Sequence, residues 1–435
     1  GGARVILDAG THPQHDGFDT LPRLEDLPDD DVDGIIVTHA HHDHIGALPV
    51  VCRYFPQAPV YATEETLDIG EAMLHNSVNV MNAQRRELGI AAYPLYTHRE
   101  IDEIAPGWLP RKFGQRFSLG PDGGLATTFL PAGHVLGAAG VVFRDAGRTV
   151  FYTGDVHFED QTLCTAADFS NLEGDKLDAL IIETTRGDSE RRPDYTRESE
   201  VDRLINAIAE TLDRGGSVML PVFALGKTQE LLLILHEAIR SGRLPSIPVH
   251  IGGLSTKITQ LFDRLSDRVR RHHRGFRILD HFPELVVPSR KDPLPPYGPG
   301  RIYAISSGMM SENTVSNKFA HHFLPDPNNA ILFVGYADPD TPGGRILAAE
   351  PGEKVSLNDR DAGRRLPVDC RVEKFDFSGH APRDQLLDFI LRTDPRHVLL
   401  VHGDAPARQW FIDQLAEKRP RMKITIPVPG EKISL

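Results

Sequence analysis

The densest group of metal-binding side chains in the sequence lies in residues 38–44, which read Thr-His-Ala-His-His-Asp-His. Imidazole nitrogens and carboxylate oxygens are good zinc ligands. The segment begins where a short apolar run, residues 34–38, ends, and a strand end would hold the ligands rigidly while leaving one metal face open. Crowding these groups together without a cation would be costly, although a histidine-rich surface loop is the alternative. The spacing predicts a metal site with the ligands His39, His41, Asp43 and His44.

Two isolated residues elsewhere in the chain could complete this ligand set. His134 follows a predicted strand at residues 127–130, and Asp155 follows another at residues 149–153. A glycine directly precedes each of them and permits a close approach of the backbone. Taken singly, each would be a turn residue more often than a ligand. Together with the first group, they are predicted to be further metal ligands.

The elements that must position these residues alternate between short β-branched runs and helical stretches, which predicts an α/β protein. The first strands are expected at residues 5–7, 34–38, 127–130, 140–143, 149–153 and 179–183. From about residue 185 the pattern changes to repeated strand and helix units, with strands at 217–222, 248–251, 301–305 and 330–333. Such units predict a parallel sheet flanked by helices. After about residue 369 we expect strands at 372–377, 397–402 and 423–427, with helices at 383–391 and 405–417.

Composition limits the class of protein. A chain of 435 residues suits two domains, and no apolar run approaches the roughly 20 residues that cross a bilayer, so we expect no membrane span. Three widely separated cysteines favour buried thiols and a cytoplasmic location over a disulfide framework. The net charge of −13 opposes nonspecific attraction to nucleic acid. Residues 264–291 are locally basic, however, and are either a solvated surface or a surface that contacts phosphates.

The metal-binding residues occur in the order Asp8, His39, His41, Asp43, His44, His134 and Asp155. This order resembles the metallo-β-lactamase superfamily, which implies two zinc ions at the edge of an αββα sandwich. By this resemblance His39, His41 and His134 would hold one zinc ion, whereas Asp43 and His44 would hold the other. Asp155 would bridge both ions, and Asp8 would orient a ligand histidine. The resemblance also implies strands before Asp8, so we expect either an upstream segment or an unusual register in this region.

Three further motifs resemble the β-CASP branch of this superfamily, whose members are nucleic-acid-processing nucleases. They contain Glu183 in Ile-Ile-Glu-Thr-Thr, His380 in Phe-Ser-Gly-His-Ala and His402 in Val-His-Gly-Asp. The resemblance implies a β-CASP domain at residues 185–369, inserted in a metallo-β-lactamase domain formed by residues 1–184 and 370–435. It implies that His402 is an added zinc ligand, and it implies catalytic roles for His380, Glu183, Asp43 and Asp8. The residues expected to bind substrate are Lys227, Ser306, Ser307 and Ser378.

The resemblance is nearest to RNA-processing nucleases, and it implies a zinc-dependent nuclease that cleaves single-stranded RNA. A hydroxide shared by the two ions would attack phosphorus and leave 5′-phosphate and 3′-hydroxyl ends. His380 would protonate the departing oxygen. The expected partners are RNA or single-stranded DNA, and either a second copy of the chain or an RNA-processing complex. The alternatives are a catalytically silent scaffold in such a complex and a small-substrate hydrolase of the thioesterase or lactamase type.

Overall fold

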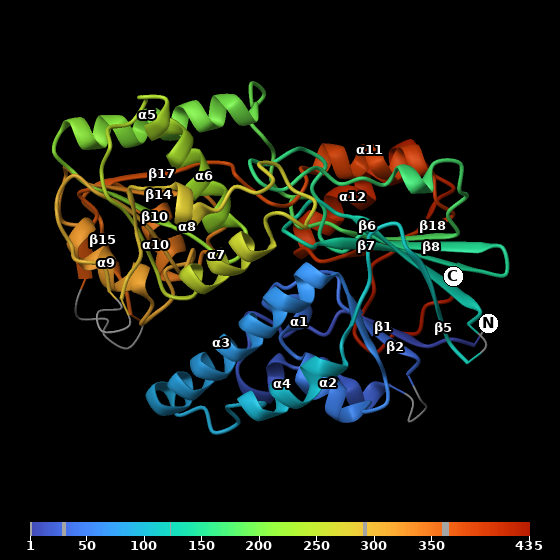
Figure 1. Ribbon diagram of the computed structural model, residues 1–435. Helices are drawn as coiled ribbons and strands as arrows, with labels where there is room; N and C mark the ends of the chain where they lie inside the picture. The colour runs from blue at the N-terminus through green and yellow to red at the C-terminus, as the bar shows by residue number, and fades with distance from the viewer. Residues whose placement is uncertain (1, 28–31, 122, 290–293, 359–364) are drawn as a thin grey trace. The chain divides into compact units, whose positions relative to one another are not determined.

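The computed structural model describes residues 2–27, 32–121, 123–289, 294–358 and 365–435. The chain forms two compact units (Figure 1). The first contains Gly1–Asp160, Cys164–Glu190 and His380–Leu435, and the second contains Gln161–Leu163 and Arg191–Gly379. The chain therefore passes from one unit to the other slightly after the expected domain limits at 184/185 and 369/370. The expected limits stay a prediction.

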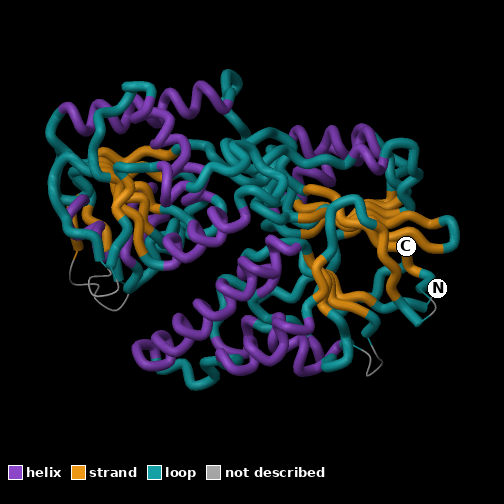
Figure 2. The backbone as a smooth tube through the Cα atoms, viewed as in Figure 1, coloured by secondary structure: helices purple, strands orange, loops and turns teal. Residues whose placement is uncertain are grey.

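Two β-sheets form the centre of the first unit (Figure 2). The smaller sheet is parallel and has the order β1 (Val5–Leu7), β2 (Gly34–Ile36), β3 (Val60–Ala62) and β4 (Leu109–Pro110). The larger, seven-stranded sheet has the order β19 (Lys423–Thr425), β18 (His397–Val401), β9 (Ala179–Glu183), β8 (Arg148–Tyr152), β7 (Ala139–Asp145), β6 (Leu125–Pro131) and β5 (Arg116–Leu119). Strands β8, β9, β18 and β19 run parallel to one another, whereas β5 to β8 are antiparallel.

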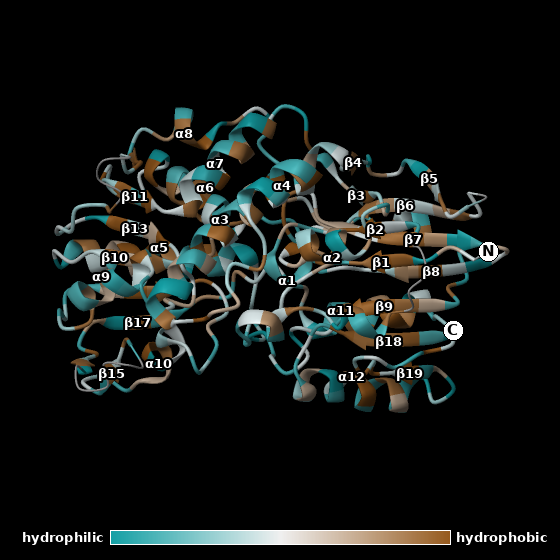
Figure 3. Ribbon diagram, turned by 90° about the horizontal axis from the view of Figure 1, so that it is seen from below, coloured by the Kyte–Doolittle hydropathy of each residue, from teal (hydrophilic) through white to brown (hydrophobic). Residues whose placement is uncertain are grey.

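Helices cover the outer face of each sheet. The helices α2 (Leu48–Tyr54), α3 (Glu64–Leu88) and α4 (His98–Ile104) pack on the smaller sheet, and α11 (Arg383–Thr393) and α12 (Ala405–Lys418) pack on the larger one (Figure 1). Side chains alternate between the two faces of β2, so Ile35 packs under the helices while Ile36 packs against Phe129 of the other sheet. Figure 3 shows β9 and β18 as largely hydrophobic strands, as expected for strands buried on both faces. The predicted αββα sandwich is confirmed.

The second unit contains a six-stranded sheet in which every pairing is parallel. Its order is β12 (Leu285–Val286), β11 (Val249–Gly252), β13 (Ile302–Ile305), β10 (Val218–Pro221), β14 (Ala330–Phe333) and β17 (Arg371–Lys374). The helices of this unit are α5 (Arg197–Asp213), α6 (Lys227–Arg240), α7 (Leu254–Leu265), α8 (Ile278–His281), α9 (Val315–Phe323) and α10 (Pro342–Ala348). Strands β15 (Lys354–Ser356) and β16 (Arg365–Pro367) pair antiparallel in a separate two-stranded sheet. The predicted parallel sheet with flanking helices is confirmed.

Two parts of the chain differ from the expectations drawn from the sequence. The 25-residue helix α3 lies in a region, residues 45–126, for which no element was predicted. The strand expected at residues 372–377 ends at Lys374 and pairs with β14, so it belongs to the sheet of the second unit. Among the described residues, no helix is long and apolar enough to cross a membrane.

Candidate metal centre

The candidate ligands lie at the carboxyl ends of strands of the first unit. Asp8 follows β1 and His39 follows β2, while His134, Asp155 and His402 follow β6, β8 and β18. Strands β6 and β8 both pair antiparallel with β7, so they point in the same direction as β9 and β18. The ends of these strands therefore meet at one edge of the larger sheet. Asp8 and His402 both adopt a left-handed backbone, with φ of 61° and 49°, a conformation found often at functional sites.

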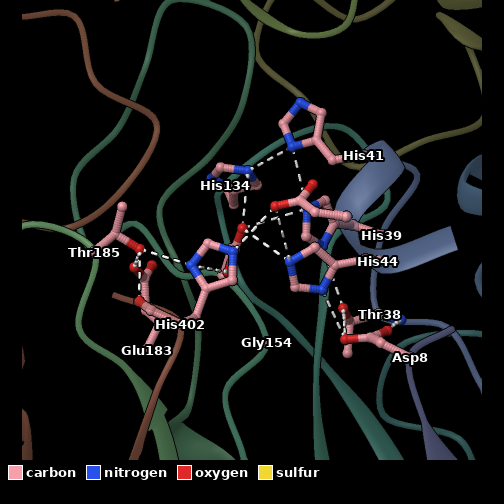
Figure 4. Close-up of polar contacts among 12 residues, drawn as sticks. Asp8, Thr38, His39, His41, His44, His134, Gly154, Glu183, Thr185 and His402 are labelled. Carbon is pink, nitrogen blue, oxygen red and sulfur yellow. Dashed lines mark hydrogen bonds and ion pairs between the residues drawn. The ribbon is translucent and has the colours of Figure 1, made fainter. Parts of the chain in front are cut away.

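One group of candidate ligands consists of His39, His41, His134 and Asp155, whose ligand atoms all lie within 4.8 Å of one another. His41 Nδ1 lies 3.1 Å from His39 Nε2 and 3.0 Å from His134 Nε2. Asp155 Oδ2 lies 3.4 Å from His39 Nε2 and 3.6 Å from His134 Nε2. The side chains of His39, His41 and His134 point toward one another in Figure 4. These residues could hold one metal ion.

A second group consists of Asp43, His44 and His402. Asp43 Oδ2 lies 3.1 Å from His402 Nε2 and 3.8 Å from His44 Nε2. Asp155 Oδ2 is 3.4 Å from His44 Nε2, so this carboxylate lies beside both groups. Gly154 permits this approach, because it adopts a φ of 54° and a Cβ there would lie 3.0 Å from Cβ of Thr38. All seven side chains predicted to bind metal are thus brought together in the first unit.

Two carboxylates, Asp8 and Glu183, lie within hydrogen-bonding distance of ring nitrogens of histidines in the site. Asp8 Oδ2 lies 2.8 Å from His44 Nδ1 and accepts hydrogen bonds from the hydroxyls of Thr38 (2.9 Å) and Tyr152 (2.7 Å). Glu183 is buried and lies with its two carboxylate oxygens 3.1 and 3.0 Å from His380 Nδ1. The backbone amide of Val156 donates to Glu183 at 2.8 Å. The His380 ring stands 4.5 Å, centroid to centroid, from the His134 ring, so the pair lies at the border of the first group.

The electrostatics differ between the two groups. Burial lowers the pKa of His39 well below its usual value and that of His41 to about 4, which favours the neutral imidazoles that bind metals. Burial alone would also lower the pKa of His44 and His402, but the carboxylate of Asp155 and its neighbours raise both, that of His402 to about 9. Likewise, burial would lower the pKa of His380, but Glu183 and Asp155 raise it.

A metal ion fits these residues. His44 Nε2 and Asp155 Oδ1 are buried without a hydrogen-bond partner within the described part of the chain. Leaving such polar atoms without partners costs free energy, and a cation between the two groups would satisfy them. The donor set of imidazoles and carboxylates is the one that zinc and similar transition metals prefer.

A third, exposed group lies apart from these, on α3 and α4. Glu71, His75 and Asp102 also bring potential ligand atoms within 4.8 Å of one another. His75 Nε2 is 3.4 Å from Asp102 Oδ1 and 3.9 Å from Glu71 Oε1. Any count of bound metal must therefore distinguish this group from the buried centre.

The residues expected to bind substrate lie in the second unit. Lys227 begins α6 after β10, and Ser306 and Ser307 follow β13, so they stand at the same edge of the six-stranded sheet. The Lys227 ammonium donates to the carbonyl of Phe377, the residue before Ser378. Ser307 Oγ accepts from the Ser311 amide at 3.0 Å. Their roles toward a substrate stay a prediction.

The locally basic stretch is partly structural. Arg271 is buried and donates to the backbone carbonyls of Phe262 and Phe276 at 3.3 and 2.8 Å. Arg277 lies 3.6 Å from the carboxylate of Asp280. Arg290 and Lys291 lie outside the described residues, as do the first two residues of the proline-rich loop that follows. The contact of this stretch with phosphates stays a prediction.

Sequence reasoning gave no role to three residues of the site: Thr38, Tyr152 and Thr185. The Thr185 hydroxyl lies between Glu183 and His402, and the Tyr152 hydroxyl bonds Asp8. The signal available was position alone, because Thr38 directly precedes His39 and Thr185 stands two residues after Glu183. Hydroxyl residues are too common for that signal to single them out.

The two-layer sandwich, with histidines and carboxylates gathered at its strand ends, defines a metal-dependent hydrolase. Three family models match the chain in sequence order. Their descriptions are Metallo-beta-lactamase superfamily (residues 1–212), Beta-Casp domain (residues 228–346) and Zn-dependent metallo-hydrolase RNA specificity domain (residues 365–427). The chain belongs to the β-CASP branch of the metallo-β-lactamase superfamily.

Curated relatives match along nearly the whole chain. It is 30% identical to "Ribonuclease TTHA0252" of Thermus thermophilus, with 93% of this chain and 88% of that protein covered. It is 29% identical to "Endoribonuclease YSH1" of Eremothecium gossypii, with 93% of this chain and 52% of that protein covered. It is also 29% identical to "Transcription termination factor FttA" of Cenarchaeum symbiosum, over 92% of this chain and 63% of that protein. The chain thus spans only about half to two thirds of the latter two relatives.

A solved structure supports the fold. A protein of unknown function from Enterococcus faecalis matches with a TM-score of 0.58 and 17% identity, over 99% of this chain and 94% of that one. At this identity the match indicates a shared fold alone.

Proposed function

We propose that the protein is a two-zinc nuclease that hydrolyses phosphodiester bonds of single-stranded RNA and leaves 5′-phosphate and 3′-hydroxyl ends. The observation that carries the proposal is the convergence of two groups of ligand side chains beside the hydrogen-bonded pair of His380 and Glu183. Relatives that are named ribonuclease and endoribonuclease, together with the RNA specificity match, support RNA as the substrate.

The ligand roles follow the two groups. His39, His41 and His134 would hold one zinc ion, and Asp43, His44 and His402 would hold the other. Asp155 would bridge the ions because one of its oxygens lies within 3.6 Å of ligand nitrogens from both groups. When bound, the pair of ions lowers the pKa of water toward neutrality and offsets negative charge on the phosphate oxygens.

His380 would supply the proton that the departing ribose 3′ oxygen requires. Glu183 fixes the ring through Nδ1, so Nε2 is the nitrogen that would donate toward a substrate. Glu183 and Asp155 raise the pKa of His380, which favours the protonated imidazole that a general acid needs. Asp8 would orient His44 from behind, and Asp43 would act at the metal itself.

Lys227, Ser306, Ser307 and Ser378 would contact the phosphates of the bound strand. Lysine acts here as a point charge and serine as a neutral hydrogen-bond donor, so these contacts would be independent of base sequence. Such contacts also suit single-stranded DNA, which is an alternative substrate of the same centre. A cytoplasmic location, and assembly as a homodimer or in an RNA-processing complex, stay predictions that cell fractionation and light scattering can test.

The proposal is tested with end-labelled RNA and DNA strands of one sequence, incubated with zinc-loaded protein. We expect cleavage of the RNA, with product ends that a 5′-phosphate-dependent ligase accepts, and no cleavage after chelation. Asp43→Ala/His44→Ala should abolish cleavage, whereas the control His15→Ala/Asp19→Ala, which changes two exposed residues of the same unit, should not.

Three outcomes would overturn the proposal. Cleavage that persists in the Asp43→Ala/His44→Ala variant would place the chemistry elsewhere. Hydrolysis of a thioester or lactam by a chain that leaves both polynucleotides intact would favour a small-substrate hydrolase instead. A zinc-loaded chain that hydrolyses none of these substrates would favour the silent scaffold.

A further inference from the structure

The hydroxyl of Thr185 connects two residues of the centre that do not touch directly. It donates to Glu183 Oε2 and lies 2.9 Å from Nδ1 of His402 (Figure 4). On the other side of the ring, His402 Nε2 lies 3.1 Å from Asp43 Oδ2. The hydroxyl of Thr185 therefore contacts Nδ1 of His402, whereas the other ring nitrogen, Nε2, contacts Asp43 of the second ligand group.

The direction of each hydrogen bond follows from which atoms carry hydrogens. A threonine hydroxyl has one hydrogen, and the short contact to the Glu183 carboxylate uses it. The carbonyl oxygen of His402 also lies 3.2 Å from this hydroxyl, but the one hydroxyl hydrogen is already donated to Glu183 at the shorter distance. The remaining contact, with His402 Nδ1, must then be one in which the ring donates and the hydroxyl accepts.

A second threonine repeats this arrangement across the site. The Thr38 hydroxyl donates to Asp8 Oδ2 at 2.9 Å and lies 3.2 Å from Nδ1 of His39. Asp8 thus contacts His44 directly, and Glu183 contacts His380 directly. Each carboxylate also reaches one further histidine through a threonine hydroxyl.

We propose that Thr185 is a positioning residue, which keeps the proton of His402 on Nδ1 and so presents the Nε2 lone pair to the second metal ion. Thr38 does the same for His39 and the first ion. The inference rests on the proposed metal centre and deepens it, because it names the groups that fix the tautomer of two ligands. Partners behind ligand histidines typically contribute a factor of about 10–100 to metal affinity.

The experiment compares Thr185→Val, which keeps the shape of the side chain but loses the hydroxyl, with Thr185→Ser, which restores the hydroxyl. Thr184→Val is the matched control, because this neighbouring hydroxyl donates to the Val401 carbonyl and does not reach the ligands. Zinc affinity is measured by competition with a chromophoric chelator. The variants also carry Glu71→Ala/His75→Ala, so that the exposed group of α3 and α4 does not contribute.

We expect Thr185→Val to weaken the second zinc ion by about 10–100-fold and to leave the first ion nearly unchanged. Thr185→Ser and Thr184→Val should bind both ions with nearly the affinity of the parent, because neither removes the hydroxyl that contacts His402. In the long-range proton–nitrogen spectrum of the zinc-loaded parent, His402 should carry its proton on Nδ1. Thermal unfolding of the metal-free variants shows whether each one folds, and Thr38→Val provides an independent case in which the first ion should be weakened.

Equal affinity of Thr185→Val and its parent for both ions would overturn the proposal, and so would equal losses in Thr185→Val and Thr184→Val. Neither outcome depends on RNA. A parent chain that binds two zinc ions but cleaves no RNA would instead refute the proposed function while leaving the role of Thr185 intact.

Discussion

Replacing His380 with alanine separates general acid catalysis from metal chemistry. The ring is held by both oxygens of Glu183 and has a raised pKa, which favours the protonated form that could supply the proton an RNA 3′ oxygen needs to depart. A positioned general acid contributes about 10²–10⁴-fold in rate. At 1.36 kcal/mol for each tenfold change, this is about 3–5 kcal/mol of transition-state stabilisation. We expect His380→Ala to lose this amount on RNA.

The assay uses two substrates that differ in the leaving group. The leaving group of bis(p-nitrophenyl) phosphate is p-nitrophenolate, a stable anion that needs no proton to depart. His380→Ala should therefore lose less than about tenfold in rate on this substrate. On RNA, the wild-type rate should fall as the pH rises through the raised pKa of His380, because the acid loses its proton, and the variant should lack this decline.

Zinc content and a histidine control complete the design. His15→Ala, at an exposed histidine stacked on His12, should behave as the wild type. If His380→Ala retains its zinc and yet slows both substrates to the same extent, the ring does not act on the leaving group and its assigned role is wrong.

Three further predictions concern the metal and the fold. Metal affinity, measured by chelator competition, should rise between pH 6.5 and 8.5, because the pKa of His402 is raised to about 9 and the imidazolium must lose a proton before it can bind a metal ion. An affinity that does not change with pH would contradict this prediction. Gly10→Ala should lower the unfolding free energy by about 1–3 kcal/mol or more and weaken zinc binding, because its Cβ would lie 1.6 Å from the Asp43 carbonyl oxygen. The control Gly107→Ala, which has open space around its Cβ, should change neither quantity. Phe411→Ala, at a fully buried ring of α12, should cost about 3–5 kcal/mol in urea unfolding without removing any ligand.

The ligands were predictable because their signal is local. His39 to His44 lie within six residues at the end of an apolar run, and strand ends flanked by glycine revealed His134 and Asp155. The parts played by Thr38 and Thr185 were not predictable in this way. The contact between Thr185 and His402 joins positions 217 residues apart, and nothing in the local pattern of either segment indicates it.

The fold was predictable where strands and helices alternate regularly, as in the parallel sheet of the second unit. Helix α3 was missed because polar residues and Gly70 interrupt its apolar pattern. Its packing explains that glycine, since a Cβ at Gly70 would lie 2.4 Å from Cδ1 of Ile45, the last residue of the short helix α1 (His42–Ile45). The strand β17 shows a second limit: its sequence indicates a strand, but only its pairing with β14 determines to which sheet it belongs.

The candidate centre joins the two layers of the sandwich, and this links its geometry to the packing between them. His39, His41, Asp43 and His44 follow β2 of the smaller sheet, whereas His134, Asp155 and His402 follow strands of the larger one. Each group of ligands therefore draws on both sheets. The distance between the layers is set by buried side chains such as Ile36, Phe129 and Val141. Because close-packed cores resist small displacements, these apolar contacts hold the ligands at metal-binding separations before any ion arrives, and a bound ion in turn stabilises the contact between the sheets.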